Sequence, residues 1–310
     1  MKDIFPDKTC EETAELVADF FTSIADEFEP LIDQEIPASA TRGDFIPIRE
    51  EEVIDGIKSC KKPNGLLHGD IFLGLLVKYC DVLSTPLTNV FNSCMLHECW
   101  PSIWKLETVS VIQKCPGPCN LGETHNISCT PIFSKIFEFF ILSRLKKDVK
   151  PGRNQFGGIS GSSRDHYLTE AWTDIMYTLD QEGSACNFIS VDFVKPFNTI
   201  GHQHCISSKV KKNVANHTAR MVGRVLKNRM MQFRVGYIMS SLRPLRGGAP
   251  QGMLLGNYLF VLATDDLERT GSHNDESNGV LESVDLRTGS SLLLEWNGMG
   301  PPARSLFQAT

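Results

Sequence analysis

A short run of β-branched residues at 108–112 lies between long segments with helical periodicity, and this mixture constrains the fold most. The run alternates as a half-buried strand does. Apolar side chains in 10–30 recur at steps of three and four residues, which predicts an amphipathic helix. The same period predicts a helix over 132–148. The expected fold class is therefore α+β, helix-rich with a small antiparallel sheet.

The rest of the chain repeats this alternation as far as residue 270. Further helices are predicted at 51–59, at 72–91 with a kink or a new start near Pro86, at 165–180 and at 254–263. Strands are predicted at 187–193 and in a hairpin of 231–235 and 237–239 around Gly236. In the 165–180 helix, the spacing directs four apolar side chains to a core: Leu168, Trp172, Ile175 and Leu179.

Composition narrows the class of protein. With 41% hydrophobic residues in 310, the chain can bury one or two cores. Its ten cysteines show no paired framework spacing, and the first residues are not an apolar leader, which predicts an intracellular protein of the cytoplasm or nucleus. There is no run of about 18 uncharged apolar residues, so we expect neither a signal peptide nor a membrane span.

The charge is distributed unevenly along the chain. Residues 1–60 hold 16 Asp and Glu against five Lys and Arg, whereas residues 193–264 hold eleven basic residues and no acidic one. A basic stretch of this kind suits a polyphosphate partner, although it is equally compatible with a solvated helix face. The candidate nucleic-acid-binding residues are Lys209, Lys211, Lys212, Arg220, Arg224, Lys227 and Arg229.

Five short blocks resemble, in order, the reverse-transcriptase domain of non-LTR (LINE-type) retrotransposons. The first three resemble fingers segments of that family: WPSIWKLETVSVIQK (100–114), THNISCTPIFSKIFEFFILSRL (124–145) and NQFGGISGSSRDHYLTEAW (154–172). The last two resemble its palm motifs A and B: SVDFVKPFNTIGH (190–202) and RGGAPQGMLLGNYLF (246–260). The resemblance covers roughly residues 50–267.

This resemblance implies a partial right-hand polymerase, with fingers and an incomplete palm, in a truncated copy of a mobile element. The expected organisation is an acidic helical leader at 1–49 and a reverse-transcriptase-like region at 50–270. A disordered or irregular tail is expected at 271–310, because turn-forming residues are scattered there without a sustained period. The implied activity is RNA-directed DNA polymerisation, with an RNA template and a DNA primer as partners. The oligomeric state is not predicted.

The resemblance also assigns site residues. Asp192 matches the motif A aspartate, a catalytic residue and ligand of Mg²⁺, a hard cation that prefers carboxylate oxygens. An ordinary strand-end aspartate that caps the next turn is the alternative. Phe197 matches the aromatic residue beneath the nucleotide sugar, Gln251 and Gly252 match the motif B pair, and Lys114 matches a fingers lysine that meets the triphosphate. For Lys114, an ordinary surface lysine is nearly as good an interpretation.

Several positions depart from the family pattern. His125 stands where the family usually has Arg, and Pro196 where Ala is common, so we expect weaker triphosphate binding. Asn198 replaces a frequent Asp. The Tyr-x-Asp-Asp hairpin of motif C is not found: Asp265 and Asp266 come only 14 and 15 positions after Gln251, which favours the end of the 254–263 helix. One carboxylate does not hold two ions, so we predict an inactive polymerase.

Three other interpretations remain open. A residually active polymerase would use Asp192 with Asp265 or Asp266. A nucleic-acid-binding or scaffold remnant would act through the basic stretch at 193–264. A zinc site would use four ligand-type side chains within 15 residues, although their spacing does not match the usual knuckle: Cys115, Cys119, His125 and Cys129.

Overall fold

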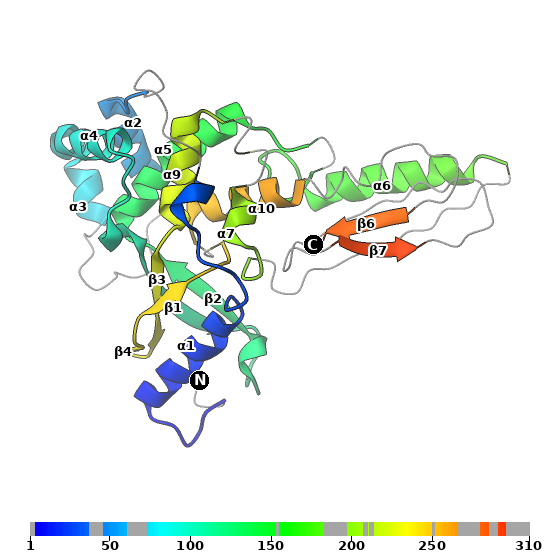
Figure 1. Ribbon diagram of the computed structural model, residues 1–310, viewed down its shortest axis with the longest axis horizontal. Coiled ribbons are helices and arrows are strands. Elements are labelled where there is room, and N and C mark those ends of the chain that lie inside the picture. Colours follow the sequence, from blue (N-terminus) through cyan, green and yellow to red (C-terminus); the bar gives the residue numbers. More distant parts are fainter. Residues whose placement is uncertain are drawn as a thin grey trace.

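In the computed structural model a group of helices lies above a small sheet, and the N-terminal helix lies below it (Figure 1). The described residues are 4–36, 46–60, 73–152, 155–182, 197–206, 210, 214–249, 252–265, 280–284 and 291–295. The α-helices are α1 (Cys10–Ser23), α2 (Glu50–Ser59), α3 (Leu73–Lys78), α4 (Cys80–Leu96), α5 (Ile132–Asp148), α6 (Arg164–Leu179), α7 (His202–Cys205), α9 (Asn216–Leu226) and α10 (Leu254–Thr264). Short 3-10 turns are η1 (Asp33–Glu35), η3 (Ser102–Lys105) and η4 (Leu121–Glu123).

The main sheet has five strands in the order β2-β1-β3-β4, with β5 also paired to β3. The strands are β1 (Leu106–Gln113), β2 (Thr124–Cys129), β3 (Arg229–Val235), β4 (Ile238–Met239) and β5 (Arg243–Leu245). The predicted hairpin is confirmed, since β3 and β4 pair antiparallel around Gly236, whose φ is +63°. The sheet is nevertheless mixed rather than antiparallel, because β1 and β3 pair in parallel. The long chain between them, which includes α5 and α6, supplies the crossover that a parallel pair needs.

The larger core lies among α2, α4, α5, α9 and α10. The rings of Phe91 and Phe137 stack with centroids 5.3 Å apart, and Trp100 packs on Phe137 at 4.6 Å. Aromatic pairs of this kind contribute about 0.5–1.5 kcal/mol each beyond their buried area. The helices predicted at 51–59, 132–148 and 254–263 are confirmed as α2, α5 and α10. The helix predicted at 72–91 is two helices, α3 and α4. They divide at Tyr79 rather than near Pro86, which lies inside α4.

A second core joins α1 to the sheet. Val17 and Phe21 of α1 are buried with Val109 of β1 and Phe233 of β3, and the rings of Phe21 and Phe233 stack at 5.8 Å. The helix begins with a capping box in which the Thr9 hydroxyl accepts from the Glu12 amide at 3.1 Å and the Glu12 carboxylate accepts from the Thr9 amide. The acidic N-terminal helix is thus part of the fold.

Helix α6 differs from its prediction. It forms as the period indicated, but it extends away from the other helices (Figure 1). Leu168, Trp172 and Leu179 are 51%, 65% and 50% exposed, so the predicted burial of this face is wrong. Only Tyr167 and Ala171 are buried in α6, near its N-terminal end, where Phe156 packs against Tyr167.

Part of the predicted irregular tail is regular. Strands β6 (Val280–Val284) and β7 (Ser291–Glu295) pair antiparallel. The predicted strand at 187–193 lies outside the described residues. Among the described helices, none combines the length and the apolar character that crossing a bilayer would need.

Candidate functional site

Two turns from the palm-like blocks, 197–201 and 247–249, are bound to each other by backbone contacts. The amide of Ala249 donates to the carbonyl of Phe197 at 2.6 Å, and the amide of Gly248 donates to the carbonyl of Ile200 at 2.7 Å. Gly201 and Gly247 form an isolated antiparallel bridge. A ring nitrogen of buried His202 lies 3.1 Å from the carbonyl of Gly248, and burial lowers the pKa of this imidazole to about 4. The two blocks therefore meet in a fixed register.

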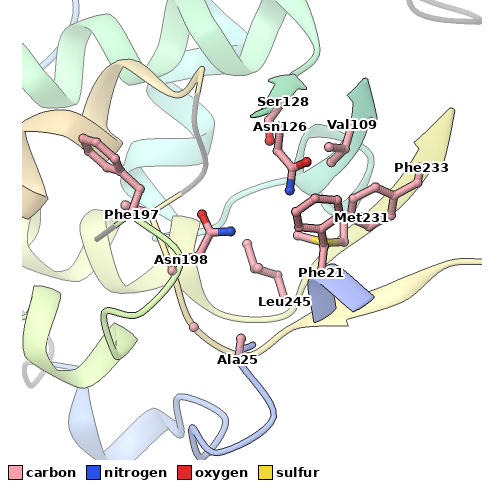
Figure 2. A pocket seen from close by; sticks show the side chains of 13 residues that line it. Phe21, Ala25, Val109, Asn126, Ser128, Phe197, Asn198, Met231, Phe233 and Leu245 are labelled. Carbon is pink, nitrogen blue, oxygen red and sulfur yellow. The ribbon is translucent and has the colours of Figure 1, made fainter. Parts of the chain in front are cut away.

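A small cavity lies between these turns and the sheet (Figure 2). Its walls come from four parts of the chain: Phe21 and Ala25; Val109, Asn126 and Ser128; Phe197 and Asn198; and Met231, Phe233, Leu245, Gly247, Gly248 and Ala249. The volume is about 40 Å³, which accommodates roughly two or three water molecules. A nucleotide does not fit within the cavity in this conformation.

Two carboxamides bring polarity to this mostly apolar cavity. Asn126 comes from β2 and Asn198 follows Phe197, and both side chains lie among the lining residues in Figure 2. The side-chain oxygen of Asn126 is buried and has no hydrogen-bond partner among the described residues. A buried amide oxygen without a partner costs free energy, so a donor that entered the cavity would be favoured there.

Phe197 lies at the edge of this cavity. Its ring points toward α10, where it packs on Phe260 with centroids 4.8 Å apart (Figure 2). The ring is partly buried and its backbone carbonyl holds Ala249. The structure thus brings Phe197 against the block that resembles motif B. Its contact with a nucleotide sugar stays a prediction.

The backbone at position 252 requires a glycine. Its φ is +128°, and a Cβ added there would collide with the carbonyl oxygen of Ser128 on β2. The resemblance matches Gly252 to the motif B pair, and the backbone that this glycine approaches in the structure is that of β2. Gly252 therefore ties the turn before α10 to the sheet.

Glu138 of α5 holds the first turn of α10. Its carboxylate accepts from the amides of Leu254 and Leu255 at 2.8 and 3.5 Å and lies 3.3 Å from the Ser134 hydroxyl. The residue is fully buried, and burial raises the pKa of this carboxyl to about 7. Sequence reasoning missed Glu138, although a lone carboxylate among the apolar residues of α5 is a visible signal.

Five of the predicted site residues lie outside the described residues: Asp192, Gln251, Lys209, Lys211 and Lys212. Lys114 is described and exposed, near the end of β1, where its Nζ donates to the carbonyl of Gly122 at 3.2 Å. It does not line the cavity, so the structure does not bring Lys114 together with Phe197.

The described candidates for nucleic-acid binding all have acidic partners. Arg220 pairs with Glu98, and Arg224 and Lys227 both pair with Asp33 at 2.6 Å. Arg229 pairs with Glu107 at 2.5 Å, and both side chains are 0% exposed. The assignment of Arg229 to a nucleic-acid surface is therefore wrong, because its guanidinium lies in the interior.

The described carboxylates form no metal centre. Asp265 is the C-terminal cap of α10, is 4% exposed and accepts from the amide of Gly152, which confirms that it ends this helix. In the described part of the chain, no three His, Cys, Asp or Glu side chains are grouped to bind a metal ion. Cys115 and Cys119 of the zinc alternative are exposed, and the side chain of His125 is not described.

Comparison with known proteins adds to this geometry. No protein-family model matches the chain. The chain is 29% identical over 229 residues to the probable RNA-directed DNA polymerase from transposon BS of Drosophila melanogaster, which covers 71% of the chain and 25% of that protein.

Two further relatives come from the same fly. The probable RNA-directed DNA polymerase from transposon X-element is 26% identical, and the RNA-directed DNA polymerase from mobile element jockey is 25% identical; each match covers 58% of the chain and 20% of the relative. The chain thus spans a quarter or less of the length of these relatives. It carries a reverse-transcriptase-like domain similar to that of non-LTR retrotransposon polymerases.

Proposed function

We propose that residues 50–270 are the fingers and part of the palm of an RNA-directed DNA polymerase domain. The observation that carries this proposal is the meeting of three blocks: Phe197 binds the 247–249 turn through its backbone, and Ser128 lies against Gly252. These residues come from the segments that resemble motif A, motif B and the fingers. An RNA template and a DNA primer are the partners that the relatives' names imply.

In this proposal Asp192 is the catalytic carboxylate and the ligand of Mg²⁺. No group of three metal-ligating side chains occurs among the described residues, and Asp192 lies outside them. Phe197, Gln251 and Gly252 form the nucleotide side of the site, with Lys114 on the fingers. The cavity beside Phe197 must widen before a nucleotide enters.

We further propose that these 310 residues do not polymerise DNA by themselves. The sequence contains one carboxylate that matches the family's metal ligands, and Asp265 already caps a helix and holds Gly152. A single carboxylate leaves the charge of two divalent ions unbalanced.

Primer extension with an RNA template, a DNA primer and either Mg²⁺ or Mn²⁺ tests this proposal. The expected result is no incorporation above the level of an Asp192→Ala variant. Incorporation that Asp192→Ala abolishes would contradict the predicted inactivity and support the polymerase function. Binding of a deoxynucleoside triphosphate to the primer-template complex, weakened by Phe197→Ala, would support the nucleotide site independently of turnover.

A nucleic-acid-binding scaffold is the second candidate function. It is favoured by the eleven basic residues without an acidic one in 193–264. Arg234 and Arg246 are exposed, and reversing both charges should weaken binding to an RNA–DNA duplex and lower the salt dependence by about one unit of slope per lost phosphate contact. If the wild-type chain does not bind the duplex at low salt, this function is removed.

A further inference from the structure

The acidic leader crosses the basic part of the molecule. We use "leader" for residues 4–36, which contain α1 and η1. Arg243 of β5 donates to Glu15 and to Asp19 at 2.8 Å each. At the other end of the leader, Asp33 accepts from Arg224 and from Lys227 at 2.6 Å each. Three cations from the basic stretch are thus neutralised by three leader carboxylates.

These carboxylates are reachable from solvent. The hydrogen bond from Lys227 lowers the pKa of Asp33, and the hydrogen bond from the Ser241 amide lowers the pKa of Glu15. Their side chains are 64% and 41% exposed, and that of Asp19 is 63% exposed. Pairs at this exposure are screened by salt and exchange with competing ions.

The leader also closes the cavity beside Phe197. Phe21 and Ala25 form one of its walls. The ring of Phe28 packs so closely on Gly201 and Gly247 that a Cβ on either glycine would meet it. The same segment therefore covers the bridge between the palm-like turns and also pairs with the three cations.

We propose that the leader and a polynucleotide compete for one surface, in which the leader carboxylates take the place of phosphates. The side chains of this surface that pair with the leader are Arg224, Lys227 and Arg243. Each of these side chains is 19–29% exposed while the leader is bound, so release of Asp33, Glu15 and Asp19 makes three donors available. The inference rests on the proposed function only for the identity of the polyanion.

The placement of the contacts on different elements favours a polymer over a single anion. Arg243 lies on β5, whereas Arg224 and Lys227 lie at the C-terminal end of α9, and the leader reaches the first through α1 and the other two through η1. A polynucleotide supplies phosphates at regular intervals along such a path, and each neutralised phosphate adds about 0.9 to the salt slope. A small anion would bind either Arg243 or the pair at the end of α9.

Binding of an RNA–DNA duplex to the full chain over a range of salt concentrations tests the competition. The variant Glu15→Gln/Asp19→Asn/Asp33→Asn removes the competing charges and keeps the side-chain shapes. We expect it to bind about tenfold tighter than wild type at low salt, with a salt slope steeper by about two to three. Apolar contacts of Phe21 and Phe28 keep the leader folded, which far-UV circular dichroism checks.

The matched control is Asp7→Asn/Asp26→Asn/Glu29→Gln. It changes the same number of charges at exposed leader positions for which the described residues show no ion pair. If the leader competes with the duplex, the test variant should bind the duplex at least fivefold more tightly than this control does. Equal gains would overturn the inference, because net charge alone would then explain both.

Hydrogen exchange provides a readout that does not depend on affinity. Addition of the duplex to wild type should speed amide exchange in 26–36, where Asp33 is released. Wild-type binding without faster exchange there would overturn the inference and leave the proposed nucleic-acid function intact. If neither wild type nor the test variant binds the duplex, the inference and the proposed nucleic-acid function are both wrong.

Discussion

The basic stretch at 193–264 forms ion pairs both in the interior and at the surface, and the two groups of pairs differ in their exposure to solvent. Arg229 meets Glu107 where both side chains are 0% exposed. Arg224, Lys227 and Arg243 meet the leader's carboxylates at the surface, where the acidic partners are 41–64% exposed. One stretch of sequence thus supplies both an interior charge and exchangeable surface charges.

The difference teaches that residue type and local charge do not decide whether a cation can meet a ligand. In the interior, a charge without a partner is very costly, so its pairing is a condition of folding. At the surface, water and salt compensate the charge, and its partner can be exchanged. The exposed pairs are therefore the ones to consider for binding, and the buried pair is the one to consider for stability.

Removing the interior cation should have the largest effect. Arg229→Met leaves Glu107 buried without its partner, so we expect the free energy of unfolding to fall by about 3–5 kcal/mol. Chemical denaturation at neutral pH measures this loss. The double variant Arg229→Met/Glu107→Leu removes both charges and should recover most of it. A single variant as stable as wild type would show that the pair is not an interior pair in solution.

The comparison also shows what the sequence could predict. Periodicity located α2, α5 and α10, and Gly236 marked the β3–β4 turn correctly, because these are local properties of the chain. The parallel pairing of β1 with β3 could not be predicted in this way, since it joins segments more than 100 residues apart. The predicted burial of α6 was wrong for a related reason. The periodicity of apolar residues shows which face of a helix is apolar, but it does not show whether another element covers that face.

For the candidate site, the resemblance predicted the residues but not their contacts. It matched Phe197 to motif A and Gly252 to motif B, whereas the backbone bonds of Ala249 and Gly248 that join the two blocks are seen only in the structure. It could not predict that Asp33 binds Arg224, because the two charges are distant in sequence and either could have been solvated. Glu138 was accessible to reasoning, since a carboxylate among buried side chains needs donors.

The second prediction concerns an interior carboxylate that makes no direct ion pair with any described residue. Burial raises the pKa of Glu138 to about 7 from its ordinary 4.5, so the folded protein binds a proton more tightly than the unfolded chain does. This contribution to stability is complete below pH 4.5 and is lost as pH rises through 7. A shift of this size corresponds to about 3 kcal/mol.

The isosteric variant Glu138→Gln does not titrate and isolates this contribution. The difference in unfolding free energy, wild type minus variant, should fall by about 3 kcal/mol between pH 4 and pH 8. Urea denaturation of both proteins at the two pH values measures it, and the other titrating groups cancel. A difference that grows with pH would mean that the amides of Leu254 and Leu255 hold Glu138 as a carboxylate, contrary to the prediction.

The smallest effect is expected at the surface. Arg243→Met removes the contacts with Glu15 and Asp19, and because solvent screens these charges the loss should be only about 0.2–1 kcal/mol at low salt. In 1 M salt the loss should largely disappear, since the Debye length there is about 3 Å. Arg234→Met, which removes an exposed arginine bound to the Ser110 hydroxyl, is the control for loss of the side chain itself. Thermal unfolding at both salt concentrations measures the two variants. A loss at Arg243 that persists in high salt would assign its role to packing, and the surface pairs would then resemble the interior pair more than their exposure indicates.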